Sequence, residues 1–258
     1  MKYSENKKHQ ITVAWDTSEG KRRLFDSRFN KDFFELAHRF QPQMKPTYCG
    51  VASAVTVLNA LRLKTGLRID SGLEVQAPTC HGGDTMHYNS YSQMTFMNED
   101  TDRVKPREWV EGVTVACEKT GDIVFEPGLN LDELAAKLKL YFLNVQPKHA
   151  DITEVPKTSK DNPITRFRQD LMAYLNDKST FIIANYHGRS IGKNVGGHFS
   201  PIAAYHKATD SCLVMDVAGH KHPWFWVSVT DLYHSMATKD QGSKETRGYM
   251  LVSDKLRH

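Results

Sequence analysis

Apolar residues recur at helical spacing in three stretches of this chain. In residues 49–63, valines and leucines lie three or four positions apart, and small side chains occupy the other side of the expected helix. Such a helix is typically buried on most of its surface. The same spacing predicts helices at 131–141 and 164–175, the first of them opened by an Asn-x-x-Glu capping box that begins at Asn130.

The pattern changes in the second half of the chain. Short apolar runs bounded by turn residues follow one another there, as β-strands do. The expected strands are 181–186, 198–205, 212–217 and 249–253, with a helix at 230–236 and an isolated strand-like run at 11–15. Helices first and strands later indicate an α+β fold with an antiparallel sheet. We treat residues 1–258 as one catalytic domain, in which 70–106 is a polar surface excursion that could serve as a lid.

Composition and charge limit the classes of partner. The 258 residues carry a net charge of +4 without a run of five or six basic side chains, so nothing favours nucleic acid. No apolar run approaches the roughly 18 residues of a membrane-spanning helix. The N-terminus lacks the apolar core of a signal peptide. We therefore expect a cytoplasmic protein that binds no membrane, while export without such a signal, or after removal of a leader, stays open.

Candidate chemistry centres on a cysteine at the start of the first predicted helix. Cys49 could be a small core residue, a metal ligand or a nucleophile. A helix N-terminus favours a thiolate, because its unpaired N–H groups and the macrodipole stabilise an anion. A nucleophilic thiol also needs an imidazole and an orienting group, and His198 and Asp216 occur on two strands that should pair as a hairpin. Gln43 can donate to an oxyanion together with the Cys49 N–H, and Gly197 leaves space beside the imidazole.

The other cysteines are dispersed along the chain. Cys80, Cys117 and Cys212 form no CxxC pair, and we expect structural roles for them, with Cys212 facing the core. A metal or thiol contact made by Cys80 and the neighbouring His81 is the weaker alternative. The aromatic run at 224–226 is expected to cap the sheet or to wall the cleft.

The residues around the candidate thiol and its partners form recognisable motifs. These are Gln43, Tyr48-Cys49-Gly50, Gly197-His198-Phe199-Ser200-Pro201 and Asp216-Val217, within the stretches SRFNKDFFELAHRFQPQMKPTYCGVASAVTVLNAL, GHFSPIAAYHKATDSCLVMDVA and RGYMLVS. They resemble the papain-like cysteine peptidase superfamily and, more closely, the phytochelatin synthases. The resemblance covers roughly residues 27–253, with a poorer match at 70–125. It implies a papain-like cysteine protease fold, in which the helix that carries the nucleophile packs on an antiparallel sheet.

This resemblance also implies acyl transfer from glutathione. Cys49 would be the nucleophile, His198 the general base and later acid, Asp216 the orienting carboxylate, and Gln43 the oxyanion-hole amide. Attack on the cysteinyl–glycine amide would release glycine and leave a γ-Glu-Cys acyl-enzyme. A second glutathione would then give phytochelatin, in heavy-metal detoxification, whereas water would give γ-glutamylcysteine.

The family likewise suggests the substrate contacts. Asp240 and Arg247 would hold the ammonium and carboxylate of the γ-glutamyl group, and Gly50 and Gly197 would line the site. No tightly bound cofactor and no metal site in the protein are implied. Cd or Zn ions would act as activators or inside metal–glutathione thiolates that serve as substrate. A homodimer is left open, and we do not expect the Cys-rich C-terminal half of the plant members.

One position departs from the family pattern. The family usually has an arginine where this chain has Gly219, so we expect weaker binding in the acyl pocket, or of a second glutathione, unless Lys221, His220 or His222 compensates. Three functions therefore compete. They are the transferase, a hydrolase that only deglycylates glutathione or its conjugates, and a non-enzymatic metal-binding protein, against which four dispersed cysteines count.

Overall fold

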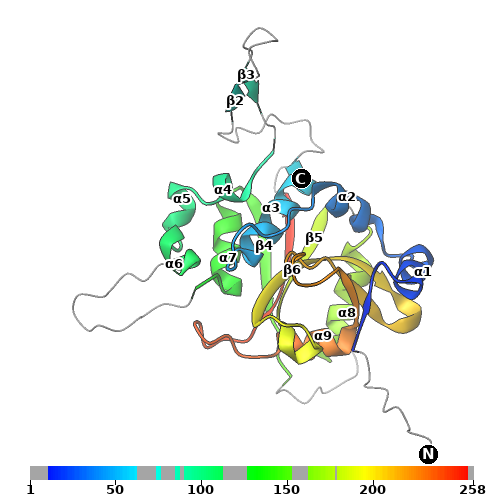
Figure 1. The fold of residues 1–258 in the computed structure, drawn as a ribbon. Helices are drawn as coiled ribbons and strands as arrows, with labels where there is room; N and C mark the ends of the chain where they lie inside the picture. Colours follow the sequence, from blue (N-terminus) through cyan, green and yellow to red (C-terminus); the bar gives the residue numbers. More distant parts are fainter. Residues whose placement is uncertain are drawn as a thin grey trace, which may run out of the picture.

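The computed structural model describes residues 11–62, 74–76, 85–87, 90–112, 127–152, 162–177 and 179–254. In this part of the chain, a seven-stranded antiparallel sheet has the strand order β1-β8-β7-β6-β5-β9-β4 (Figure 1). Its strands are β1 (Thr12–Ala14), β4 (Leu143–His149), β5 (Thr180–His187), β6 (Gly197–His206), β7 (Ser211–Val214), β8 (Phe225–Ser228) and β9 (Gly248–Asp254). β2 (Glu74–Gln76) and β3 (Thr85–His87) form a separate two-stranded sheet.

Helices cover both faces of the large sheet. α3 (Cys49–Arg62) and α7 (Leu131–Lys139) pack on one face, whereas α8 (Pro163–Tyr174) and α9 (Val229–Met236) pack on the other (Figure 1). The other described helices are α1 (Ser18–Asp26), α2 (Lys31–Arg39), α4 (Gln93–Phe96), α5 (Glu99–Asp102) and α6 (Arg107–Glu111). None of the helices in the described residues is long and apolar enough to cross a membrane.

Alternating side chains explain how the sheet is buried on both faces. Successive residues of a strand point to opposite sides. Phe181 and Ile183 of β5 join the apolar cluster under α3 and α7, whereas Ile182 and Ala184 join the cluster under α8 and α9. β5 is therefore buried along nearly its whole length, and its sequence reads as an unbroken apolar run.

The predicted α+β organisation with an antiparallel sheet is confirmed. The helix expected at 49–63 is α3, in which every residue after Cys49 is buried. Asn130 and Glu133 form the expected capping box at the start of α7. The other predicted helices correspond to α8 and α9, and the strands at 11–15, 181–186, 198–205 and 249–253 correspond to β1, β5, β6 and β9.

Four elements have no clear signal in the apolar pattern. α1 and α2 are short and mostly polar, and they leave Phe25 and Phe34 81% and 65% exposed. β4 is an edge strand that contains Pro147, so its alternation is incomplete. β8 contains most of the aromatic run at 224–226, for which the cleft-wall alternative is wrong, because Phe225 and Trp226 are fully buried in the sheet and do not line the cleft.

The stretch at 70–106 is described only in part. Residues 70–73, 77–84 and 88–89, with the suggested lid and with Cys80, lie outside the described residues, as does Cys117. From residue 90 onward the expectation of a surface excursion is wrong. Phe96, Met97 and Val110 join the main apolar cluster and Thr101 is fully buried, so this stretch packs against the core.

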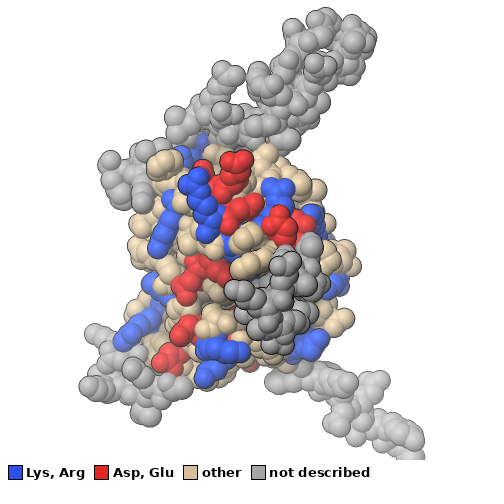
Figure 2. All heavy atoms as spheres, turned by 90° about the vertical axis from the view of Figure 1, so that its left-hand side faces the viewer, with Lys and Arg blue, Asp and Glu red and all other residues tan. Residues whose placement is uncertain are grey.

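The surface over α4–α7 carries mixed charge. Basic and acidic side chains are interspersed on this face (Figure 2). Lys45 pairs with Glu111 at 2.6 Å and Lys105 pairs with Glu133 at 3.2 Å. The basic side chains of this face are therefore partly neutralised by close carboxylates.

Candidate active site

Cys49 is the first residue of α3. The preceding residues form a turn, in which the Tyr48 N–H donates to the Lys45 carbonyl at 3.0 Å. The Tyr48 carbonyl then accepts from Ala52 N–H at 2.8 Å and begins the helical ladder. Cys49 is partly buried at this helix N-terminus, where the macrodipole favours an anion.

His198 and Asp216 meet in the interior of the protein. His198 is the second residue of β6 and is 4% exposed, and its Nε2 donates to Asp216 Oδ1 at 2.8 Å. The expectation that Asp216 lies on a strand is wrong, because β7 ends at Val214. Instead, Asp216 begins the next turn, and its Oδ1 also accepts the Ala218 N–H at 2.8 Å. A turn residue can accept from both the imidazole and its own backbone, which fixes the carboxylate.

The three groups are electrostatically coupled. Burial raises the pKa of the Cys49 thiol, but the charge and hydrogen bond of His198, with backbone hydrogen bonds from Phe199 and Gly50, bring it below its usual value. Burial lowers the pKa of His198, but Cys49 and Asp216 raise it to about 10. The hydrogen bond to Asp216 uses Nε2, which leaves Nδ1 for the sulfur. The arrangement therefore favours a thiolate–imidazolium pair near neutral pH.

Gln43 lines the same cavity, but its amide points to its own loop. Its Nε2 donates to the carbonyls of Lys45 and Pro46 at 2.9 and 3.0 Å. The backbone N–H of Gln43 donates to the Val217 carbonyl at 2.8 Å and connects this loop to the turn after Asp216. An oxyanion contact from the Gln43 side chain therefore requires one of these two side-chain bonds to be exchanged.

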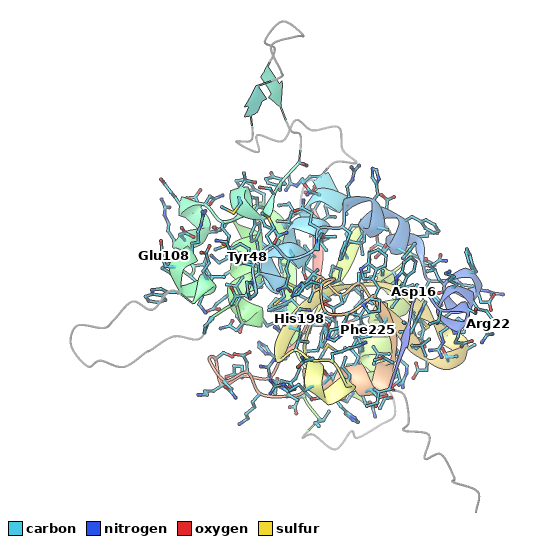
Figure 3. All side chains as sticks on the ribbon, viewed as in Figure 1. Asp16, Arg22, Tyr48, Glu108, His198 and Phe225 are labelled. Atoms are coloured by element: carbon cyan, nitrogen blue, oxygen red, sulfur yellow. The ribbon has the colours of Figure 1, made fainter. Side chains whose placement is uncertain are left out.

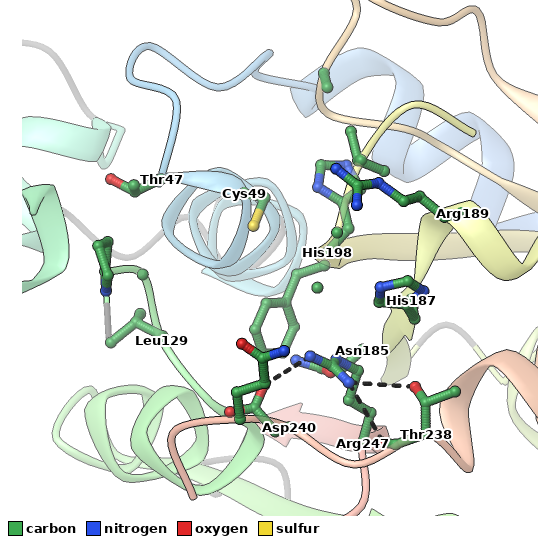
Figure 4. Close-up of a pocket in the computed structure, with 18 of the residues that line it drawn as sticks. Thr47, Cys49, Leu129, Asn185, His187, Arg189, His198, Thr238, Asp240 and Arg247 are labelled. Carbon is green, nitrogen blue, oxygen red and sulfur yellow. Dashed lines mark hydrogen bonds and ion pairs between the residues drawn. The ribbon is translucent and has the colours of Figure 1, made fainter. Parts of the chain in front are cut away.

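A cavity of about 680 Å³ opens in front of Cys49 and His198 (Figure 4). Asp240 and Arg247 line it and form an ion pair at 3.1 Å. Arg247 is held further by the Thr238 Oγ1 at 3.2 Å and the Lys239 carbonyl at 2.5 Å. Gly197 passes so close that a Cβ there would lie 2.9 Å from Arg247 Nη2. The expected substrate residues Asp240, Arg247 and Gly197 thus share one cavity with Cys49 and His198, whereas Gly50 lies behind it against Phe199 and Leu129.

Comparison with known proteins places this site in a family. The model of the phytochelatin synthase family matches residues 4–249. The chain belongs to the phytochelatin synthase family. Relatives named glutathione γ-glutamylcysteinyltransferase 1 are 31% identical over 246 residues in Triticum aestivum and 27% identical over 244 residues in Lotus japonicus. A relative named glutathione γ-glutamylcysteinyltransferase in Schizosaccharomyces pombe is 23% identical over 244 residues. These matches cover 93% of this chain, which spans 40% of each plant relative and 48% of the yeast relative.

This phytochelatin synthase family chain has a further candidate residue in the cavity that the sequence reasoning does not single out. Asn185 of β5 is 2% exposed and lines the cavity, and its side-chain carbonyl Oδ1 is buried without a hydrogen-bond partner. Buried polar atoms normally have partners, so this unpaired oxygen marks Asn185 as a candidate for contact with a ligand. The signal was one amide in the apolar run FIIANY, where a strand residue buried on a packed face is normally apolar.

Open space surrounds Gly219, where the resemblance implies an arginine. A Cβ at this position would meet no atom within 4 Å. Of the three suggested substitutes, Lys221 lines the cavity. His222 accepts the Asn194 N–H at 3.1 Å, and neither His220 nor His222 lines the cavity. Lys221 is therefore the nearest cation among them to a ligand in front of Cys49.

The cysteine in the core differs sharply from Cys49. Cys212 faces the interior from β7 as expected, and burial raises its pKa well above the usual value. Among the residues that the structure describes, no three His, Cys, Asp or Glu side chains form a group that could hold a metal ion. The described thiol with nucleophilic character is thus the one next to His198.

Proposed function

We propose that this chain is a glutathione γ-glutamylcysteinyltransferase with a papain-like catalytic domain. The observation that carries the proposal is the coupled Cys49–His198–Asp216 group, with its lowered thiol pKa, at the edge of a cavity that also holds the Asp240–Arg247 ion pair. Family membership and the names of the relatives support the same activity.

In the first half-reaction the Cys49 thiolate attacks the carbonyl carbon of the cysteinyl–glycine amide. The developing oxyanion accepts a hydrogen bond from the backbone N–H at the start of α3. It accepts a second one from the Gln43 side-chain amide, after that amide gives up one of its hydrogen bonds within the loop. The imidazolium of His198 gives its proton to the leaving nitrogen, the C–N bond breaks, and glycine departs. A thioester between Cys49 and γ-Glu-Cys remains, and Asp216 keeps the His198 ring in position.

In the second half-reaction the α-amine of another glutathione attacks the thioester. His198 takes the proton of that amine, the C–S bond breaks, and Cys49 leaves as the thiolate. The product is a γ-Glu-Cys-extended glutathione. Cd or Zn bis-thiolates of glutathione act as the acceptor substrate in this scheme, and we assign no resident metal to the protein.

The γ-glutamyl group carries an ammonium and a carboxylate. We assign the ammonium to Asp240 and the carboxylate to Arg247, because a guanidinium binds a carboxylate in a directional, charge-assisted manner. Support comes from the position of both side chains in the cavity and from Gly197, whose lack of a side chain leaves room for the guanidinium at this place.

A hydrolase is the second candidate. The open space at Gly219, where the family usually has an arginine, favours it, because the cavity then has one cation fewer for an acceptor glutathione. Water would resolve the same acyl-enzyme and give γ-glutamylcysteine.

A product assay tests the proposal. Wild type and Cys49→Ala are incubated with glutathione, with and without Cd or Zn, and products are counted by mass spectrometry. The transferase predicts glycine together with oligomers of γ-Glu-Cys, and no release by Cys49→Ala. Glycine with γ-Glu-Cys alone would establish the hydrolase instead. Release that is undiminished in Cys49→Ala would refute both.

A further inference from the structure

The residue before the candidate nucleophile is tied to a distant helix. Tyr48 is fully buried, on the α6 side of α3 (Figure 3), and its hydroxyl donates to Glu111 Oε1 at 2.5 Å. The same oxygen lies 2.6 Å from Lys45 Nζ, which also sits 5.3 Å from the centre of the Tyr48 ring. One carboxylate at the end of α6 therefore binds both ends of the turn that leads into Cys49.

The same helix also holds a neighbouring segment that lines the cavity. The Val110 carbonyl accepts the Gly128 N–H at 2.9 Å, and Gly128 lines the cavity. Pro46 and Thr47 line the cavity next to Gly128, within the turn that Glu111 holds, and a Cβ at Gly128 would lie 3.7 Å from the Thr47 carbonyl oxygen. Val110 and Glu111 of α6 thus hold two adjacent segments that line the cavity near Cys49.

We propose that Glu111 is a positioning residue for Cys49, an inference that rests on the function proposed above. Because the Tyr48 carbonyl begins the α3 ladder, a shift of Tyr48 moves the first turn of the helix. The Cys49 sulfur lies in that turn and must keep its hydrogen bond with the His198 imidazole. Displacements of about 1 Å in a reacting geometry can cost up to about a hundredfold in rate.

The ionised state of Glu111 supports its role as acceptor for Tyr48 and Lys45. The hydrogen bonds of Lys45 and Tyr48 lower the pKa of Glu111, so the carboxylate stays ionised across the working pH range. Without it, the buried Tyr48 hydroxyl would lose its acceptor, and the turn would have to open to water or repack.

The chain contains a matched control for this arrangement. Lys148 pairs with Asp170 at 2.6 Å, and Tyr249 donates to the same carboxylate oxygen at 2.5 Å, with Lys148 Nζ 5.6 Å from the ring centre. The exposures also match, with 36% and 19% for the Lys45 and Glu111 side chains and 38% and 17% for Lys148 and Asp170. Asp170 lies on α8, and neither it nor Tyr249 lines the cavity.

The experiment compares Glu111→Ala with Asp170→Ala. Thermal unfolding reports stability, glycine release from glutathione reports kcat and KM, and peptide mapping after iodoacetamide reports the alkylation of Cys49 as a function of pH. We expect both variants to lose similar stability. Only Glu111→Ala should lose about tenfold in kcat with a smaller change in KM, and its Cys49 alkylation should shift toward the higher pH of an ordinary thiol.

A conservative variant guards against simple misfolding. Glu111→Gln keeps an acceptor for the Tyr48 hydroxyl and should recover most of kcat and of the alkylation profile. Equal effects of Glu111→Ala and Asp170→Ala on kcat and on the alkylation profile, or no effect of either, would overturn the positioning role. If wild type released no glycine, the proposed function would fail, while the alkylation profiles would still decide the role of Glu111.

Discussion

Replacing Gly197 with alanine should weaken substrate binding by displacing Arg247. The added Cβ would lie 2.9 Å from Arg247 Nη2 and 3.2 Å from Nε, which is closer than ordinary van der Waals contact. Arg247 cannot simply swing away, because it is held by Thr238, Lys239 and Asp240. The substitution must therefore move the guanidinium out of the position in which we assign it the γ-glutamyl carboxylate.

The magnitude follows from the interaction at risk. A hydrogen bond to a charged group contributes about 1.5–3 kcal/mol. At 1.4 kcal/mol for each factor of ten, this corresponds to a loss of about tenfold to a hundredfold in kcat/KM. Most of the loss should appear as a higher KM for glutathione, since Arg247 binds the γ-glutamyl group and not the reacting amide.

The assay is steady-state glycine release by Gly197→Ala, with Gly196→Ala as the control. A Cβ at Gly196 would meet no atom within 4 Å, so that variant adds the same methyl one residue earlier in the chain without the clash. We expect Gly196→Ala to change KM far less than Gly197→Ala. Wild-type KM in Gly197→Ala, or equal effects of both variants, would refute the assignment of Arg247.

Three further predictions follow from the charges. Iodoacetamide should alkylate Cys49 substantially at pH values below the usual thiol pKa, because His198 lowers the pKa of Cys49, and the pH profile should shift to higher pH in His198→Ala. Identical pH profiles of wild type and His198→Ala would contradict the coupling. Asp216→Asn should lower kcat by about a hundredfold or more in the glycine assay with little change in KM, because the His198 ring loses its ionised acceptor; near-normal kcat would argue against this role. Burial lowers the pKa of Lys137 from 10.5 to about 8, so the unfolded chain holds that proton more tightly, and this residue's contribution to stability rises with pH between those two values. Lys137→Met should remove that rise and lower the free energy of unfolding in urea by about 1–3 kcal/mol, because the carbonyls of Thr101 and Lys105 lose their buried donor. A variant as stable as wild type at both pH 7 and pH 9.5 would exclude this role of Lys137.

The candidate triad could be predicted because its signals are local. Cys49 stands at the start of a strongly periodic helix, and His198 opens an apolar strand. Asp216 was an unusual carboxylate in an apolar run, although the position of the strand end two residues earlier depends on how the sheet pairs. Local patterns therefore identify these residues, but only the fold gives their geometry.

Other parts of the site depend on contacts between distant segments. Tyr48 and Glu111 lie 63 residues apart, and neither carries a sequence pattern that points to the other. The engagement of the Gln43 amide by its own loop depends on a turn that has no periodic signal. The substrate role of Asp240 and Arg247 was expected only from a family likeness, because two charges seven residues apart in a polar loop normally indicate a solvated surface.

The most direct test of the central claim is to capture the acyl-enzyme. Wild type is mixed with glutathione, quenched in acid within the first turnover, and digested for peptide mass spectrometry. The account predicts one γ-Glu-Cys group as a thioester on Cys49, with glycine released in equal amount, and no adduct in Cys49→Ala. Glycine release with no adduct on Cys49, or with the adduct on another residue, would contradict it.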